Sequence, residues 1–396
     1  MLGGGFAFAL GQADGSLWGM KTKAAVLRQM ELPRPYAESR PLSIEEVELD
    51  GPKEGEVLVQ VAGAGLCHSD LSVINGSRPR PVPMVLGHEA AGIIREVGPG
   101  VKDLKPDDHV VFSFVPCCGG CSMCAVGRAP LCEPAFEAAI TGQLLHGGRR
   151  FAFSDGAEVN HHQGVSGYSE YTVAVPESLV KIDKSYPIDV ATLFGCAIMT
   201  GVGAVVNTAR VQPGTSTAVF GLGGVGLSVV MGLKLVGAYP IIAVDMLENK
   251  LELARQAGAT HVINASEVDP VSAMRDLTGG GAVDVFEAVG SEKVLGQAYA
   301  ATRKGGRTIT VGLPDPAREL KIPALSLVAE ERQILGSYMG SCVPKRDIPR
   351  FLQLYREGQL PVDILNSRFV TLDQVNEGFD ALDQGEVARQ IIKFDI

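Results

Sequence analysis

The chain has 396 residues, of which 46 % are hydrophobic and 20 % are charged, with 48 glycines and 23 prolines. This composition excludes a disordered chain, and the length is about twice that of a typical domain, so two domains are expected. The net charge of −10 argues against a nucleic-acid binder or an anionic-membrane binder, because phosphate contacts need a basic face. The expected partners are small molecules or proteins.

The N-terminus predicts neither an anchor nor a leader. The apolar run 6–10 is far shorter than the roughly 20 residues of a membrane span, and residues 1–19 lack the basic and apolar regions of a signal peptide. Residues 1–20 are expected to be an extension, or to reflect a start codon upstream of Met20. Eight cysteines are too few for a disulfide scaffold, and five of them lie between Cys117 and Cys132. This clustering predicts a metal site in a cytoplasmic protein.

Residues 23–196 predict a mostly β domain, because short alternating apolar runs are separated by Gly/Pro turns. A cysteine cluster with the spacing C-x2-C-x2-C-x7-C lies within it. Four such thiolates can surround one Zn²⁺ in a closed structural site. An iron–sulfur cluster is a weaker alternative, because the ferredoxin pattern places its fourth cysteine after three residues. The expected ligands are Cys118, Cys121, Cys124 and Cys132.

Cys117 leaves the register of this cluster open, since it directly precedes Cys118. We choose Cys118 because it gives two equal gaps of two residues. Cys117 and Cys342 are expected to be buried free thiols. Another set of metal-ligand residue types is dispersed, namely Cys67, His88 and Cys196. No local spacing joins these three, although two cysteines and one histidine with an open fourth position suit a catalytic zinc.

After residue 200 the pattern changes to β runs that alternate with helices, which predicts a doubly wound parallel sheet. The β runs are 217–220, 241–245, 261–263, 283–289 and 308–312, and helices are expected at 224–237 and 248–257. A last β run at 389–394 could rejoin the first domain. The expected domains are 1–197, 198–338 and a C-terminal segment, 339–396.

The run Gly221-Leu-Gly-Gly-Val-Gly226 matches the dinucleotide-binding fingerprint, and its context supports the match. It follows a β run and opens an apolar helix, and Asp245 ends the next β run 19 residues after Gly226. Gly221 permits a tight turn, Gly223 lets a pyrophosphate approach the backbone, and Gly226 permits close helix packing. Asp245 would bind the ribose hydroxyls and repel a 2′-phosphate, so NAD is favoured over NADP. A glycine-rich turn without a ligand is the alternative.

Together these motifs resemble the zinc-dependent alcohol dehydrogenases of the medium-chain dehydrogenase/reductase superfamily. The resemblance covers nearly the whole chain and includes the zinc signature GHE-x2-G-x5-G-x2-V from Gly87 to Val101. It implies an α/β fold, in which a Rossmann doubly wound sheet joins a GroES-like mostly β catalytic domain. The C-terminal segment would return to the catalytic domain.

The resemblance also implies roles for single residues. Cys67, His88 and Cys196 would hold the catalytic zinc, with Glu89 beside it and Asp70 orienting His88. Ser69 would carry the proton away from an alcohol that the zinc activates. Ser72 occupies the position where many members have a relay histidine, so we expect the proton to pass through the ribose to water. The further site residues implied are His68 and Arg389 near the pyrophosphate, Lys250 at the adenosine ribose, and Phe114, His162, Leu313, Tyr338 and Met339 along the substrate cleft.

The implied function is NAD-linked interconversion of a primary, allylic or aromatic alcohol and its aldehyde, with two zinc ions per chain. The long loop between Cys132 and Tyr171 implies a homodimer. The first alternative is an S-(hydroxymethyl)glutathione (formaldehyde) dehydrogenase. It is disfavoured because the segment after Asn75 lacks that branch's acidic residue and Phe136 replaces its arginine. A nucleobase deaminase fails on motif spacing. A non-catalytic zinc or NAD sensor on the same scaffold is the other alternative.

Overall fold

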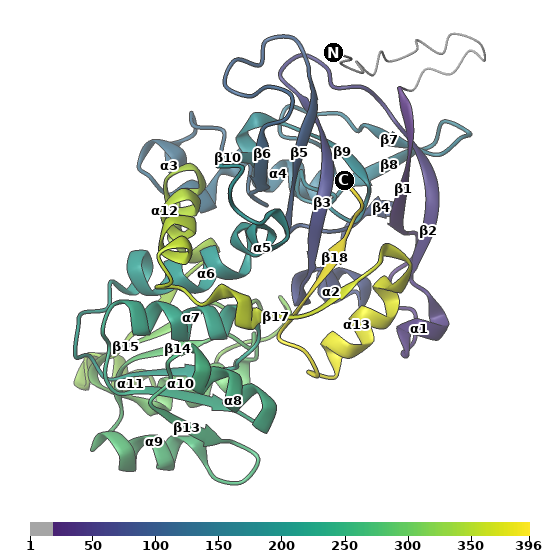
Figure 1. Ribbon diagram of the computed structural model, residues 1–396. Coiled ribbons are helices and arrows are strands. Elements are labelled where there is room, and N and C mark those ends of the chain that lie inside the picture. Colours follow the sequence, from purple (N-terminus) through teal and green to yellow (C-terminus); the bar gives the residue numbers. More distant parts are fainter. Residues whose placement is uncertain (1–18) are drawn as a thin grey trace.

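The computed structural model describes residues 19–396, so the extension expected at residues 1–20 lies almost entirely outside the described part. Figure 1 shows two lobes, one dominated by β-strands and the other a sheet flanked by helices. Among the described residues, no single helix is both long and apolar enough to cross a membrane. One helix pair, Ile188–Gly195 with Ala197–Ala209, meets both requirements only when taken together, and it is bent by 51°.

The β-rich lobe contains a small closed barrel and a larger sheet. The barrel runs β1 (Met20–Leu27), β2 (Leu42–Leu49), β7 (Phe151–Ala152), β8 (Glu158–His161) and β4 (Met84–Val85). The sheet has the order β10 (Leu179–Ile182), β6 (His109–Phe112), β5 (Ala90–Val97), β3 (Val57–Leu66), β18 (Arg389–Lys393) and β17 (Asn366–Val370), and β9 (Tyr171–Ala174) also pairs with β3. Both β3 and β5 are largely buried, which explains their nearly continuous apolar sequence.

The pairing of β3 with β5 brings together two segments that carry site residues. The strands are antiparallel, with Ala64 opposite Ala90. The chain therefore leaves β3 at Cys67 close to the point where it enters β5 after His88. Helix α2 (His68–Ile74) begins immediately after Cys67. Two residues 21 positions apart in sequence thus reach the same end of the sheet.

The second lobe is a six-stranded parallel sheet. Its order is β13 (His261–Asn264), β12 (Ile241–Asp245), β11 (Thr217–Phe220), β14 (Ala282–Glu287), β15 (Thr302–Thr310) and β16 (Gln333–Gly336). The accompanying helices are α7 (Gly224–Leu235), α8 (Glu248–Ala257), α9 (Pro270–Thr278) and α10 (Glu292–Ala301). This doubly wound sheet confirms the expected fold class, and the predicted runs match its elements to within a few residues except that β15 begins six residues earlier.

The remaining helices connect the lobes or cover their sides. They are α1 (Tyr36–Ser39), α3 (Ser122–Ala125), α4 (Glu133–Thr141), α5 (Ile188–Ala191), α6 (Ala197–Gly203), α11 (Ala324–Ala329), α12 (Pro344–Arg356) and α13 (Val375–Asp383). Helices α6 and α7 pack closely, because a Cβ added to Gly201 would come within 2.5 Å of the Ser228 Cβ. This contact connects the segment that follows Cys196 to the parallel sheet.

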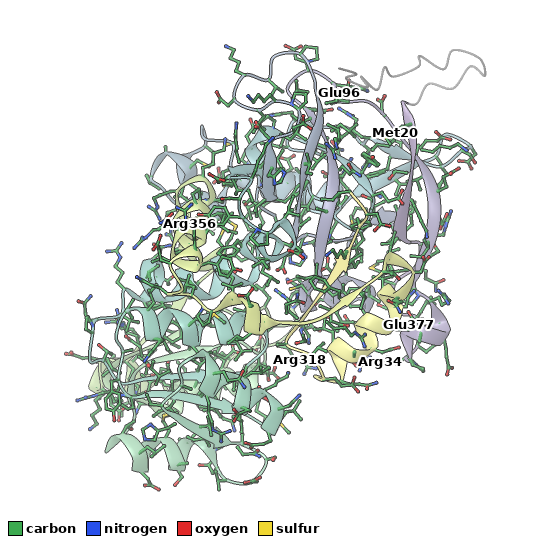
Figure 2. All side chains as sticks on the ribbon, in the orientation of Figure 1. Met20, Arg34, Glu96, Arg318, Arg356 and Glu377 are labelled. Atoms are coloured by element: carbon green, nitrogen blue, oxygen red, sulfur yellow. The ribbon has the colours of Figure 1, made fainter. Side chains whose placement is uncertain are left out.

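The end of the chain returns to the β-rich lobe, as the final β run predicts. Strand β18 lies between β3 and β17, with Ile391 and Ile392 fully buried. The Asp380 carboxylate of α13 accepts hydrogen bonds from the backbone N–H groups of Tyr36 and Ala37 at 2.7 and 2.8 Å. Arg34, just before α1, adds an ion pair with Asp383 at the end of α13 at 2.7 Å; Figure 2 labels Arg34 and, on α13, Glu377.

Candidate active site and metal centres

Three of the predicted site residues converge although they are far apart in sequence. The ligand atoms of Cys67, His88 and Cys196 all lie within 4.8 Å of one another, and all three residues are buried. The Sγ of Cys196 is 3.4 Å from Nε2 of His88. Cys67 precedes α2, His88 lies just before β5, and Cys196 precedes α6. Three separate elements therefore build one cluster.

The buried carboxylate of Asp70 sets the orientation of His88. Asp70 Oδ2 lies 3.0 Å from His88 Nδ1 and accepts a 3.0 Å hydrogen bond from the Tyr168 hydroxyl. Its Oδ1 lies 3.2 Å from His162 Nδ1. Both imidazole contacts are at ion-pair distance but fall outside ideal hydrogen-bond angles. Burial by itself would raise the pKa of Asp70, but the two histidines lower it to about 2.

A second buried carboxylate, that of Glu89, lies behind the cluster. It forms an ion pair with Arg389 at 2.9 Å and accepts a hydrogen bond from the Ala197 backbone N–H at 3.2 Å. Burial raises the pKa of Glu89 to about 7, and Cys67 adds to the shift while Arg389 opposes it. A Cβ at Gly65 would overlap the Glu89 carboxylate, so only glycine fits there. The ion pair joins the last strand to the segment that carries His88.

The chemistry of this donor set fits a catalytic zinc. Two sulfurs and one imidazole nitrogen face a common point, and the other ring nitrogen of His88 faces a carboxylate. That pairing is typical of histidines that bind zinc and leaves Nε2 as the metal ligand. Cys196 lowers the pKa of the Cys67 thiol, and Cys67 raises that of Cys196, because one sulfur accepts a hydrogen bond from the other.

The second metal-ligand cluster surrounds α3. The sulfurs of Cys118, Cys121, Cys124 and Cys132 lie within 4.8 Å of one another. Backbone N–H groups donate to two of them, from Cys121 to Cys118 Sγ at 3.3 Å and from Cys118 to Cys132 Sγ at 3.4 Å. Backbone N–H groups, that of Cys124 first, lower the pKa of Cys121 to about 6. Four sulfurs with such donors suit a closed tetrahedral zinc site.

The structure places Cys118, and not Cys117, in the four-cysteine cluster. Its Sγ donates to the Val115 carbonyl oxygen at 3.3 Å, and burial raises the pKa of its thiol to about 12. Cys117 is a free thiol outside the cluster, but it is half-buried and not fully buried as expected. Cys342 is fully buried, and its Sγ donates to the Met199 carbonyl oxygen at 3.3 Å.

The glycine fingerprint has the geometry of a phosphate-binding turn. Gly221 has a φ of +89°, and a Cβ at Gly226 would clash with the Gly221 carbonyl oxygen. A Cβ at Gly223 would meet nothing within 4 Å, so the backbone before α7 is open to a ligand. The Asp245 carboxylate accepts a 2.8 Å hydrogen bond from the Leu222 N–H, which joins the acidic strand end to the turn. These residues fit a dinucleotide.

A cationic residue, Arg389, lies beside this turn. Arg389 contacts Glu89, while its buried Nε has no partner and lies 3.1 Å from where a Cβ on Gly224 would be. Arg389 therefore connects the metal-ligand cluster to the first turn of α7. Burial lowers the pKa of the His68 imidazole. Cys67 opposes this shift, whereas the positive charges of Arg389 and Lys250 add to it. Lys250 and His68 are thus close enough to interact.

Aromatic rings lead away from His88. The Phe114 ring packs edge-on against His88 at 5.5 Å and against Tyr338 at 5.9 Å, and Phe136 packs against Tyr338 at 5.6 Å. Leu313 is 44 % exposed. Two further residues expected along the cleft are buried: His162 contacts Asp70, with its ring 5.8 Å from that of His88, and Met339 is 1 % exposed with its sulfur 3.8 Å from Ser113 Oγ.

Two arginines that the sequence analysis did not single out lie close to this group of residues. Arg78 Nη2 donates to the Ser69 carbonyl oxygen at 3.4 Å, and Arg80 affects the pKa of Tyr338. The available signal was a pair of arginines between two metal-ligand candidates, Cys67 and His88.

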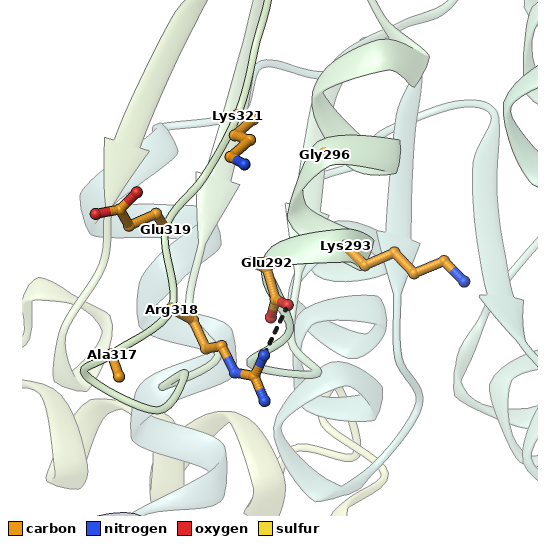
Figure 3. Close-up of a pocket in the computed structure, with 7 residues that line it drawn as sticks. All are labelled: Glu292, Lys293, Gly296, Ala317, Arg318, Glu319 and Lys321. Carbon is orange, nitrogen blue, oxygen red and sulfur yellow. Dashed lines mark ion pairs between the residues drawn. The ribbon is translucent and has the colours of Figure 1, made fainter.

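A separate pocket of about 500 Å³ lies beside α10 in the second lobe (Figure 3). Figure 3 shows Arg318 directed toward Glu292, and their charged atoms are 3.8 Å apart. Its lining combines both signs of charge and includes none of the cysteines or histidines of the two clusters. This pocket is therefore distinct from the metal centres.

Comparison with known proteins agrees with this geometry. Residues 53–184 match the alcohol dehydrogenase GroES-like domain, and residues 224–357 match the zinc-binding dehydrogenase domain. The chain is 37 % identical over 385 residues to the alcohol dehydrogenase class-3 of Cereibacter sphaeroides, and 35 % identical over 384 residues to the S-(hydroxymethyl)glutathione dehydrogenase of Paracoccus denitrificans. Each match covers 95 % of this chain and 100 % of the relative.

Solved structures agree as well. The alcohol dehydrogenase zinc-binding domain protein of Burkholderia ambifaria has a TM-score of 0.89 at 36 % identity, and the benzyl alcohol dehydrogenase of Acinetobacter calcoaceticus has 0.86 at 35 %. Each covers 95 % of this chain and 100 % of the other chain. Fold and site define a zinc-dependent oxidoreductase that uses a nicotinamide dinucleotide. The chain belongs to the zinc-dependent alcohol dehydrogenase family of medium-chain dehydrogenases/reductases, with NAD and two zinc sites as its cofactors.

Proposed function

We propose that this chain interconverts an alcohol and its carbonyl product by hydride transfer to or from NAD, with Cys67, His88 and Cys196 as ligands of the catalytic zinc. The observation that carries the proposal is the convergence of these three residues within 4.8 Å, beside an arginine that reaches the dinucleotide turn. Cys118, Cys121, Cys124 and Cys132 would hold the structural zinc. Arg389, His68 and Lys250 would bind the dinucleotide.

The chain's own groups prepare the site for proton and hydride transfer. When bound, zinc supplies a Lewis acid that lowers the pKa of an alcohol. Ser69 follows Cys67 by two residues on α2, and its hydroxyl has no hydrogen-bond partner among residues 19–396, so its oxygen is free to accept a hydrogen bond from the alcohol while its own proton is passed on. Ser72 Oγ instead donates to the His68 carbonyl oxygen at 2.8 Å. The Ser72 hydroxyl is not a base at neutral pH, so Ser72 would not be the final acceptor of the proton that leaves Ser69, and water would take that part.

Two substrate types are supported by different observations. The names of the similar proteins favour S-(hydroxymethyl)glutathione over the simple alcohols first expected from the sequence. The aromatic wall of Phe114, Phe136 and Tyr338 supports a flat or apolar alcohol, and one similar structure is a benzyl alcohol dehydrogenase. We rank the glutathione adduct first because several relatives share that name.

The test is NADH formation at 340 nm by zinc-loaded protein with S-(hydroxymethyl)glutathione and with benzyl alcohol, each with and without an external hydride acceptor. Turnover of either substrate supports the proposal, and the ratio of the two kcat/KM values ranks the substrate types. Ser69→Ala should lower kcat at least about 100-fold. The matched control, Ser72→Ala, should retain most activity, because its hydroxyl is bonded within α2. A zinc-loaded, folded protein that oxidises neither substrate, with or without the acceptor, contradicts the proposal.

A further inference from the structure

Two arginines between Cys67 and His88 have no acidic partner among the described residues. Arg78 Nη2 contacts only the Ser69 carbonyl oxygen, and Arg80 Nη1 contacts only the Pro79 carbonyl oxygen at 3.2 Å. The Nε atoms of both arginines are buried and make no hydrogen bond. Each guanidinium carries five N–H donors, so most of the donors in this pair are unused.

The arrangement is electrostatically costly without an anion. Burial lowers the pKa of Arg80, and the charge of Arg78 lowers it further, which shows that the two cations are close. Acidic residues outnumber basic ones in this chain, 45 to 35, yet no acidic residue within 19–396 pairs with either arginine. Partly desolvated like charges raise the free energy of the folded state, and a bound anion would reverse that effect.

The segment that carries the arginines is held in place at both ends. Its first end follows α2 and its second end enters β4 just before His88. The Arg78 backbone N–H donates to the Ser72 carbonyl oxygen at 2.8 Å. Pro79, Pro81 and Pro83 alternate with other residues and restrict the backbone between these ends. A pre-organised pair of cations loses little conformational entropy when it binds a ligand.

The arginines lie near the aromatic wall. Phe114 contacts both His88 and Tyr338, so the wall begins at a proposed zinc ligand. Burial raises the pKa of Tyr338, while Arg78 and Arg80 lower it and Cys196 raises it. Tyr338 is therefore near the arginines and the metal cluster alike. A ligand that reaches the zinc site along these rings would therefore also lie near the two guanidinium groups.

We propose that Arg78 and Arg80 bind a carboxylate on the alcohol substrate. The substrate class is then an alcohol with its reacting hydroxyl at one end, a flat or apolar middle and a carboxylate at the other end. This inference rests on the proposed function and narrows it. The carboxylate stays unchanged in the reaction and serves recognition, since guanidinium groups pair with it through two parallel hydrogen bonds. Hydroxy acids with an aromatic middle and the glutathione adduct both carry such a group.

The test compares two substrates of nearly equal shape, 4-(hydroxymethyl)benzoate and 4-(hydroxymethyl)benzamide. In the wild type we expect kcat/KM to be at least about tenfold higher for the carboxylate, equivalent to ~1.4 kcal/mol. The preference should decrease as the salt concentration rises from about 20 to about 500 mM. The double variant Arg78→Gln, Arg80→Gln should bring the ratio close to one. Arg303→Gln, which removes an exposed arginine from β15, is the matched control and should keep the wild-type ratio.

A charge-reversal variant distinguishes a change in substrate preference from a decrease in the amount of folded enzyme. Arg80→Glu should prefer 4-(aminomethyl)benzyl alcohol over 4-(hydroxymethyl)benzoate, which no general loss of activity can produce. With S-(hydroxymethyl)glutathione, a comparable loss in the double variant identifies the peptide carboxylate as the ligand. Retained activity there, together with a lost benzoate preference, identifies a hydroxy acid. Equal wild-type rates for benzoate and benzamide, or a ratio that the double variant leaves unchanged, overturn the inference. Failure to oxidise any alcohol would instead contradict the proposed function.

Discussion

The Asp70 carboxylate shows how much one buried residue can organise. It accepts hydrogen bonds from the Tyr168 hydroxyl and the Gly87 backbone N–H at 3.0 and 3.2 Å, and it faces two imidazoles. The sequence predicted its contact with His88 only through family resemblance. His162 and Tyr168 were not foreseen as its neighbours, because both lie more than 90 residues away in the chain. Together these contacts make Asp70 a positioning residue for the proposed zinc ligand.

Replacing Asp70 should weaken the catalytic site without abolishing the fold. Asp70→Asn removes the charge that holds His88 and should lower zinc affinity or kcat/KM by roughly 10- to 100-fold. Zinc content by elemental analysis and kcat/KM at saturating zinc separate the two effects. Asp373→Asn, which changes an exposed carboxylate paired with Lys23, is the control. Full zinc content with wild-type kinetics in Asp70→Asn would argue against this role.

Asp245 is expected to decide the choice of dinucleotide. Its carboxylate ends β12 and accepts the Leu222 N–H, so it lies where the ribose of a bound dinucleotide would be. Asp245→Ser should reduce the preference for NAD over NADP by at least about tenfold, or ~1.4 kcal/mol, when the two kcat/KM values are compared. Asp245→Asn keeps an acceptor for Leu222 and separates loss of charge from damage to the turn. A wild type that uses both cofactors equally would refute the assignment.

At the scale of elements, the cysteine loop around α3 should depend on metal more than on packing. None of the α3 residues is buried, so this loop has little apolar core of its own. Cys124→Ala should remove one zinc per chain and lower Tm by about 5 to 10 °C, because a structural zinc contributes directly to folding. Cys117→Ala is the matched control and should keep two zinc ions. Cys196→Ala should lose one zinc and its activity but keep the wild-type Tm. A decrease in the Tm of Cys196→Ala as large as that of Cys124→Ala would contradict this division of roles.

At the scale of the whole molecule, the homodimer and the cytoplasmic location stay predictions. The dimer follows from the long loop between Cys132 and Tyr171, part of which forms α4 and β7. Light scattering coupled to size-exclusion chromatography should give twice the chain mass of 41.7 kDa. The same measurement on Cys124→Ala shows whether the loop's zinc supports the association. A mass of one or four chains for the wild type would disprove the expected assembly.

The sequence by itself determined the features that depend on short spacing. These features are the glycine fingerprint, the alternation of strands and helices after residue 200 and the four-cysteine loop. Each is a local pattern, so the known rules of backbone conformation and metal-ligand spacing are enough to recognise it. Only the tertiary structure decided which distant groups meet. Arg389 reaches Glu89 across 300 residues, and Cys196 reaches His88 across 108, because β18 and α6 pack against elements formed much earlier in the chain. The same packing leaves Arg78 and Arg80 without an acidic partner in the part of the chain that the structure describes, since no local pattern reveals which charges will lack a partner once the chain has folded.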